Sequence, residues 1–205
     1  KEIFDQALSC EGVVGMAVGT RPDCVDPDKI SLLESYAKDY LVWLEYGLQS
    51  VHDATLERIN RGHAFQNFLD AVAITLNRGI RVCAHVILGL PGEDRAMMLE
   101  TADRLAEAGI NGVKIHLLYV VKGTALDKMY LAGEYQCMEQ GAYVDTVCDF
   151  IERLPEHVVI QRITGDPHPE ELRAPAWAAR YRETFNLIQH ALEDRDTFQG
   201  KKYAG

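Results

Sequence analysis

Residues 81–93 read Arg81-Val-Cys-Ala-His-Val-Ile-Leu-Gly-Leu-Pro-Gly-Glu93 and carry the clearest structural pattern of the chain. Mostly apolar residues end abruptly at Gly89, Pro91 and Gly92, and an amphipathic segment follows. The pattern predicts a buried parallel strand, a tight turn and then a helix. In sheets of this kind ligands bind where strands end and loops begin, so the turn after residue 88 is a candidate binding region.

The same strand-and-helix unit repeats along the chain. Strands are predicted at residues 11–20, 41–48, 81–88, 113–121 and 157–163. Helices are predicted at residues 26–41, 52–59, 65–78, 94–108 and 138–154, and from about residue 175. Alternating strands and helices indicate an α/β fold with parallel strands. Five units at this spacing predict a partial (β/α) TIM-like barrel.

The repeats form one predicted domain at residues 1–195, and residues 196–205 read as a loose C-terminal tail. The first residue is Lys1 rather than Met, and residues 1–8 read as the end of a helix. We therefore expect a piece of a longer protein, a barrel that lacks its first βα units. Such a piece exposes an unpaired strand edge, which predicts pairing with another copy in a homo-oligomer.

Composition narrows the class of protein. Hydrophobic residues make up 47% of the 205 residues, which indicates a globular chain, and no apolar run approaches the ~20 residues that span a membrane. The net charge of −10 argues against this segment as a large nucleic-acid contact surface. An odd number of scattered cysteines without a secretion signal indicates free thiols in a reducing cytoplasm. They are Cys10, Cys24, Cys83, Cys137 and Cys148, and none has a partner at CxxC or zinc-finger spacing.

Polar residues cluster where the predicted strands end. Because the carboxyl ends of barrel strands share one face, these side chains are expected to meet around one ligand. They suit a polar small molecule with a carboxylate, hydroxyls and a flat ring. The candidates are Thr20, Arg21, Asp23, Glu45, Gln49, Ser50, Arg61, His85, His116, Tyr119, Lys122, Arg162 and Asp166.

Structural alternatives fit several of these residues equally well. Glu45 fits an ion pair with a neighbouring Arg or Lys, and Gln49 and Ser50 fit a helix cap. Arg61 fits a solvated surface position. His85 fits a hydrogen-bonded core histidine better than a metal ligand, and no third ligand of suitable spacing accompanies it and His116. No metal site is therefore predicted, and the residues alone indicate a barrel enzyme of unspecified chemistry.

Ordered motifs add a family resemblance. Gly19-Thr-Arg-Pro-Asp23, Leu44-Glu-Tyr-Gly-Leu-Gln-Ser50, Ile59-Asn-Arg-Gly-His63 and His85-Val-Ile-Leu-Gly-Leu-Pro-Gly-Glu93 occur in this order. They resemble the radical SAM superfamily, in the branch that contains Elongator-type and coproporphyrinogen-oxidase-type enzymes. The stretches Lys114-Ile-His-Leu-Leu-Tyr-Val-Val-Lys-Gly-Thr124 and Arg162-Ile-Thr-Gly-Asp166 are similar to the YhcC-type radical SAM proteins of bacteria. The resemblance covers residues 1–195.

The resemblance implies a chemistry. Such enzymes hold a 4Fe–4S cluster on three cysteines of a CxxxCxxC-like loop, and the cluster cleaves S-adenosylmethionine (SAM) to a 5′-deoxyadenosyl radical that takes a hydrogen from the substrate. This cysteine loop and the family's Gly-rich motif are absent from the 205 residues, and the resemblance places both before Lys1. We therefore expect no cluster and no radical chemistry on this segment by itself.

The resemblance also assigns residues. Gln49 matches a position that binds the ribose of SAM, and Arg61 one that pairs with the methionine carboxylate. His85 matches a polar position near the ribose, and the backbone from Ile87 to Gly89 matches the segment that meets adenine. Glu93 is shifted by one residue from the commoner family spacing. Thr20 and Glu45 complete the expected cofactor side, and the expected substrate side comprises Arg21, Asp23, His116, Tyr119 and Lys122.

Two rival functions stay open. One is a cluster-independent barrel lyase or aldolase, in which Lys114 or Lys122 forms an imine with the substrate. The other is a non-catalytic module that binds SAM or a nucleotide. The resemblance also includes RNA-modifying enzymes, but the acidic charge counts against RNA as the main partner of this segment.

Overall fold

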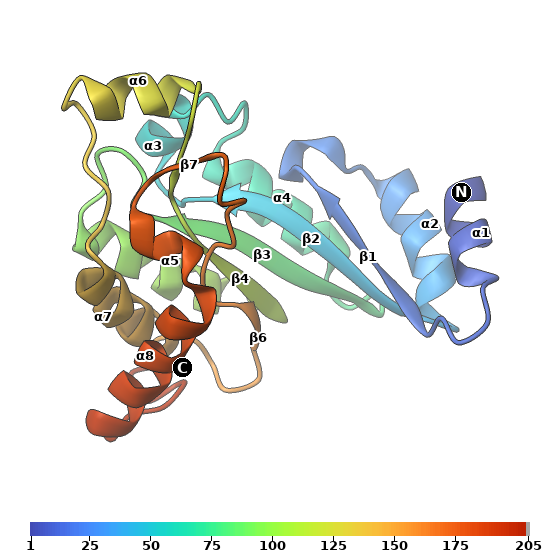
Figure 1. The fold of residues 1–205 in the computed structure, drawn as a ribbon. Coiled ribbons are helices and arrows are strands. Elements are labelled where there is room, and N and C mark those ends of the chain that lie inside the picture. Colours follow the sequence, from blue (N-terminus) through green and yellow to red (C-terminus); the bar gives the residue numbers. More distant parts are fainter. Residues whose placement is uncertain (204–205) are drawn as a thin grey trace.

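An open, five-stranded parallel sheet organises the molecule (Figure 1). Its strands are β1 (Gly15–Thr20), β2 (Leu41–Gln49), β3 (Ile80–Leu88), β4 (Gly112–Leu117) and β6 (Val159–Arg162), in the spatial order β1-β2-β3-β4-β6. Each neighbouring pair is parallel, and β1 and β6 are the two edges. The computed structural model describes residues 1–203 and confirms the predicted α/β fold and partial barrel.

Helices connect the strands. They are α1 (Glu2–Leu8), α2 (Pro27–Ala37), α3 (Asp53–Arg58), α4 (Phe65–Thr75), α5 (Arg95–Glu107), α6 (Ala125–Leu131), α7 (Gln140–Ile151) and α8 (Tyr181–Asp194), with short 3-10 turns η1 (Pro22–Cys24) and η2 (Ala176–Ala179). Side-chain caps begin three of them. Asp26 accepts a hydrogen bond from Lys29 N at 2.9 Å at the start of α2, and Asp94 and Thr124 begin α5 and α6 in the same way. No helix within residues 1–203 is long and apolar enough to cross a membrane.

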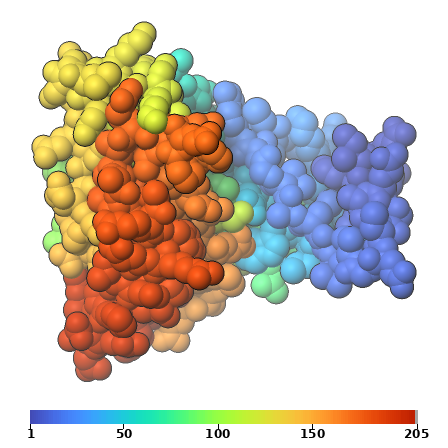
Figure 2. Space-filling view, viewed as in Figure 1, coloured from blue at the N-terminus to red at the C-terminus, as the bar shows by residue number. Residues whose placement is uncertain are grey.

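Alternation along the strands gives the sheet two unlike faces. One face packs under the helices and forms the core, with Tyr46 on β2 reaching Thr75 Oγ1 of α4 at 2.8 Å. The opposite, concave face carries Glu45, His85 and Lys114. In Figure 2 this face is recessed, with the cyan and green sheet residues deeper than the blue N-terminal and orange C-terminal parts. A polar concave face therefore lies open at the centre of the half barrel.

The predicted strand at residues 113–121 is wrong in its length. β4 ends at Leu117, Leu118 N donates to Leu88 O at 2.9 Å, and a separate β5 (Val120–Val121) pairs antiparallel with β7 (Leu172–Ala174). The apolar run is continuous in sequence because it serves two sheets in succession. The helix α6, which the sequence did not reveal, follows this small sheet near the carboxyl ends of β3 and β4 (Figure 1).

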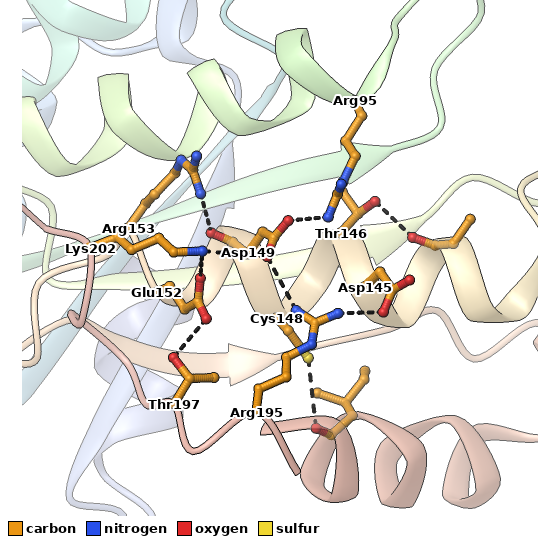
Figure 3. A network of polar contacts seen from close by, with 12 residues as sticks. Arg95, Asp145, Thr146, Cys148, Asp149, Glu152, Arg153, Arg195, Thr197 and Lys202 are labelled. Atoms are coloured by element: carbon orange, nitrogen blue, oxygen red, sulfur yellow. Dashed lines mark hydrogen bonds and ion pairs between the residues drawn. The ribbon is translucent and has the colours of Figure 1, made fainter. Parts of the chain in front are cut away.

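The C-terminal segment after residue 195 is attached to α7, whereas the sequence predicts a loose tail. Thr197 Oγ1 donates to Glu152 at 2.6 Å, and Lys202 forms an ion pair with the same carboxylate. Figure 3 shows this network, in which Arg195 also bridges Asp145 and Asp149 of α7. The polar composition of the segment suggested a tail because its partners lie about 45 residues earlier in the chain.

Candidate functional site

A hollow of about 390 Å³ lies at the carboxyl ends of β2, β3 and β4. It lies at the carboxyl ends of the strands, where the sequence predicts ligand binding. The turn from Gly89 to Gly92, which the sequence also singled out, lines a separate cavity. The hollow brings together many of the residues that the sequence singled out. Its lining comprises Gln49, His85, Ile87, His116, Leu117, Leu118, Tyr119 and Val121.

Glu45 lies behind this lining, and its carboxylate contacts the side chains of Lys114 and His85. Its Oε2 atom is 2.6 Å from Lys114 Nζ and 2.8 Å from His85 Nε2. Burial raises the pKa of Glu45, but the hydrogen bonds from Lys114 and His85 together outweigh burial and leave the pKa below its ordinary value. The carboxylate is therefore ionised at neutral pH and acts only as an acceptor.

The two histidines of the hollow are stacked on each other. Their ring centroids are 5.5 Å apart and their planes differ by 29°. Burial, together with the nearby charges of His85, Arg162 and Lys114, lowers the pKa of His116 to about 4. Burial also lowers the pKa of His85, which the contact with Glu45 offsets only in part. Both rings are thus neutral near pH 7, and His116 Nε2 is buried without a hydrogen-bond partner within residues 1–203.

Gln49 is the last residue of β2 and lines the hollow. Arg61, the second residue expected to bind SAM, contacts β2 two residues earlier, at Gly47. Arg61 donates to Gly47 O from Nε at 3.1 Å and from Nη2 at 2.6 Å, and His63 Nε2 is 3.2 Å from the same oxygen. The register of β2 against β3 shifts between Gly47 and Gln49, and Gln49 takes a left-handed φ of 75°. Such a conformation is uncommon in a non-glycine residue.

Several expected residues lie outside the hollow. Thr20 lies with Val18 on the helix-covered side of β1, where both line a separate apolar cavity against α2. The carbonyl oxygen of Gly89 accepts a hydrogen bond from the Tyr135 hydroxyl at 2.9 Å, and this glycine lines a different cavity. Lys122 points to Glu170 O at 2.8 Å.

Arg21 and Asp23 pair with each other directly after β1. Arg21 also approaches the Arg61 loop, since a Cβ atom added at Gly62 would lie 3.3 Å from Arg21 Nη1. Burial lowers the pKa of Arg61, and the positive charge of Arg21 lowers it further. Arg21 and Asp23 therefore lie beside Arg61, at the margin of the concave face.

Sequence reasoning missed some participants. The sequence suggests Lys114 only as an imine-forming residue, whereas in the structure it is the cation of the ion pair expected for Glu45. Ser50 donates to Glu93 instead of capping a helix alone, and this bond joins the loop after β2 to the turn after β3. Leu118 and Val121 were hidden inside the predicted long strand. Alternation on β4 could have found Lys114, because it lies two residues before His116 on the same face.

The cysteines do not form a metal site within residues 1–203. Cys10 and Cys24 are exposed, Cys83 and Cys148 are buried, and Cys137 is half-buried, all as free thiols. No group of three His, Cys, Asp or Glu side chains in the described residues is arranged to hold a metal ion. An iron–sulfur cluster bound by three cysteines does not fit the residues of this segment.

Family comparisons now identify the class of protein. The model of the radical SAM superfamily matches residues 2–105, and the model of the radical SAM C-terminal domain matches residues 110–194. The chain therefore belongs to the radical SAM superfamily.

Relatives of high similarity occur in archaea and bacteria. An uncharacterized protein of Methanocaldococcus jannaschii is 43% identical over 205 residues, which are 99% of this chain and 64% of that protein. YtqA of Bacillus subtilis is 41% identical (98% and 62% covered), and YhcC of Escherichia coli K12 is 42% identical (86% and 58% covered). The chain thus spans 58–64% of the length of these relatives, and the similarity is not confined to bacteria.

Solved structures support the fold. Elp3 of Methanocaldococcus infernus aligns with a TM-score of 0.76 at 21% identity, over 91% of this chain and 43% of that one. The radical SAM methyltransferase TsrM of Kitasatospora setae, with cobalamin and a 4Fe–4S cluster bound, aligns with a TM-score of 0.55 at 13% identity, over 87% and 44%.

Proposed function

We propose that the hollow binds SAM and that the chain is the SAM-binding part of a radical SAM enzyme. The observation that carries this proposal is the meeting of Gln49, His85 and His116 around one hollow at the strand carboxyl ends, in a member of this superfamily. A volume of about 390 Å³ suits a ligand the size of a nucleoside derivative.

The proposed contacts use the groups that remain free. Gln49 faces the hollow and would bind a ribose hydroxyl. Arg61 uses Nε and Nη2 on Gly47 O, so Nη1 is the nitrogen left for the methionine carboxylate. Ile87 offers an apolar surface for a flat ring, and the neutral His85 and His116 add hydrogen-bonding atoms without placing a charge against the sulfonium.

We propose that the cluster ligands belong to residues outside these 205. When bound, the cluster and SAM together supply a 5′-deoxyadenosyl radical for hydrogen abstraction from a substrate. On this proposal, His116 and Tyr119 are the residues of the hollow that contact the substrate, with Arg21 and Asp23 at its margin.

The contacts of the lysines disfavour the lyase or aldolase alternative. An imine-forming lysine must attack as a neutral amine. The amine of Lys114 is already engaged by the Glu45 carboxylate at 2.6 Å. Lys122 donates to a backbone oxygen at 2.8 Å, away from the hollow. Neither lysine is therefore presented as a nucleophile.

The test uses the full-length protein under anaerobic conditions. The protein is reconstituted with iron and sulfide, SAM and a reductant are added, and 5′-deoxyadenosine is measured. Calorimetric titration of SAM runs in parallel with His85→Leu, and with His157→Leu, an exposed histidine far from the hollow, as the control. We expect product and SAM binding that only His85→Leu weakens. Binding without product would favour a non-catalytic SAM module, and no binding to the folded protein would refute the proposal.

A further inference from the structure

We propose that Glu45 is a positioning residue that fixes His85 in the tautomer with the proton on Nε2, so that His85 presents a bare Nδ1 acceptor to the hollow. The ligand atom facing Nδ1 is then a hydrogen-bond donor, a hydroxyl or an amino group. The statement about the ligand atom rests on the proposed function. The statement about the tautomer does not, because it concerns the protein without a ligand.

The geometry around Glu45 allows one direction of the hydrogen bond. Glu45 Oε2 accepts from Lys114 Nζ at 2.6 Å, and a lysine ammonium has donors only. The same oxygen is 2.8 Å from His85 Nε2. An ionised carboxylate cannot donate, so the proton of this contact belongs to His85 Nε2.

The tautomer of His85 matters for the ligand because His85 faces the hollow and Glu45 does not. His85 lines the hollow, whereas Glu45 lies behind it and is only 8% exposed. In a neutral imidazole one nitrogen carries the proton and the other is an acceptor. His85 Nδ1 has no hydrogen-bond partner within residues 1–203. It is also not one of the fully buried polar atoms that lack a partner, so it is accessible. The free acceptor is thus left for a ligand.

His116 provides a comparison inside the same hollow. Its ring is stacked on His85 at 5.5 Å, but no carboxylate of residues 1–203 holds either of its nitrogens. The tautomer of His116 is therefore not fixed by a charged partner. A group that accepts only, such as a carboxylate or phosphate oxygen, is disfavoured at His85 Nδ1 because it would face a lone pair.

The direct test is nuclear magnetic resonance of the full-length protein with ¹⁵N-labelled histidine. Long-range proton–nitrogen correlations distinguish protonated from bare ring nitrogens, and His85→Gln assigns the signals by their loss. We expect His85 with Nε2 protonated, in excess over the other tautomer by about tenfold or more, because hydrogen bonds to charged acceptors are strong. A His85 ring protonated on Nδ1 would overturn the proposal.

Variants show whether Glu45 is the cause. The double variant Glu45→Leu/Lys114→Met removes both charges together, so no unpaired charge stays behind. We expect it to lose the downfield Nε2 proton of His85 and to populate both tautomers. Glu45→Gln, which retains a neutral acceptor, should keep the tautomer with a weaker bond. An unchanged His85 spectrum in the double variant would contradict the proposal.

The chain offers a matched control. Glu152 on α7 is also a buried glutamate paired with a lysine, Lys202, and with one further donor, Thr197 (Figure 3). The double variant Glu152→Leu/Lys202→Met makes the same two changes far from the hollow. It should leave both histidine spectra unchanged, so an equal effect of the two double variants would show a general loss of structure.

SAM then separates the two proposals. Upon SAM addition, we expect the Nδ1 signal of His85 to move toward the protonated range without a change of tautomer, because Nδ1 accepts a hydrogen bond. A switch to the Nδ1-protonated form would show an acceptor on the ligand and refute the donor assignment. If SAM does not bind by calorimetry, the proposed function fails while the tautomer result stands by itself.

Discussion

Arg61 and Gly47 form a two-pronged contact, in which Nε and Nη2 of the guanidinium donate to the carbonyl oxygen of Gly47 at 3.1 and 2.6 Å. The contact joins the loop before α4 to the end of β2. It requires the absence of a side chain on the glycine, since a Cβ atom there would lie 2.4 Å from Nη2 of Arg61 and 2.9 Å from Nε2 of Gln49. Both expected SAM contacts therefore depend on one small residue.

The variant Gly47→Ala is expected to weaken SAM binding about tenfold or more, which corresponds to ~1.4 kcal/mol. The added methyl group would push aside the Arg61 and Gln49 side chains, the two residues proposed to contact SAM. Calorimetric titration of SAM measures the effect. Gly19→Ala on β1 is the control, because a Cβ atom there meets nothing within 4 Å. Equal affinity of the two variants would show that this corner does not bind SAM.

The stability of the protein should depend on pH through His116. Its pKa is lowered from 6.5 to about 4 in the folded state, so the unfolded state binds more protons between these values. Stability is thus present above pH 6.5 and is lost as the pH falls. We expect a loss of about 1 kcal/mol between pH 7 and pH 5, below the full linkage value because the ring is partly solvated.

Urea unfolding at the two pH values measures this loss. His116→Leu should reduce the difference between pH 7 and pH 5, whereas His190→Leu, on an exposed position of α8, should retain it. The same pH difference in His116→Leu as in the unaltered protein would assign the dependence to other groups.

Deletion of residues 197–205 should lower the free energy of unfolding by about 2–3 kcal/mol. Glu152 loses both Lys202 and Thr197, which leaves a buried carboxylate without these partners. Chemical denaturation provides the measurement. Lys201→Ala is the control, because the Lys201 side chain donates to Asp196 O and not to Glu152. A deletion as stable as this control would mean that the network of Figure 3 contributes little.

The free edge of β1 predicts association of the 205-residue chain. β1 pairs with β2 on one side only, and its residue Ala17 is exposed. Light scattering should show oligomers that become fewer in Ala17→Lys, since a charge on an edge strand opposes pairing. Gln66→Lys on the exposed surface of α4 adds the same charge elsewhere and should have no effect. A monodisperse monomer of the unaltered chain would contradict the prediction.

The order of the elements and part of the site are readable from sequence. The parallel strands can be located because buried strands are continuously apolar. Each apolar run ends at a turn, as at Gly89 and Gly92, or just before a segment with helical periodicity. The rule that strand carboxyl ends share a face then brings Gln49, His85, His116 and Tyr119 together, and the structure places these four around one hollow.

Other features depend on distances between residues remote in sequence. The run at residues 113–121 divides between two sheets because β7 arrives from residues 172–174, which no local pattern announces. Thr20 lies at the end of β1, as expected, but strand register places it on the side of the sheet that α2 covers. Gly89 follows β3, as expected, but its carbonyl oxygen is bound by Tyr135.

The alternation of strands and helices, the end of the sheet where the polar candidates gather, and the family can be read from the sequence, because these follow from local periodicity and contiguous motifs. The contact of Lys114 and His85 with the carboxylate of Glu45, 69 and 40 residues away, is visible only in the folded chain. Ionisation and tautomer depend on atoms within hydrogen-bond distance, and strand register alone brings those atoms together.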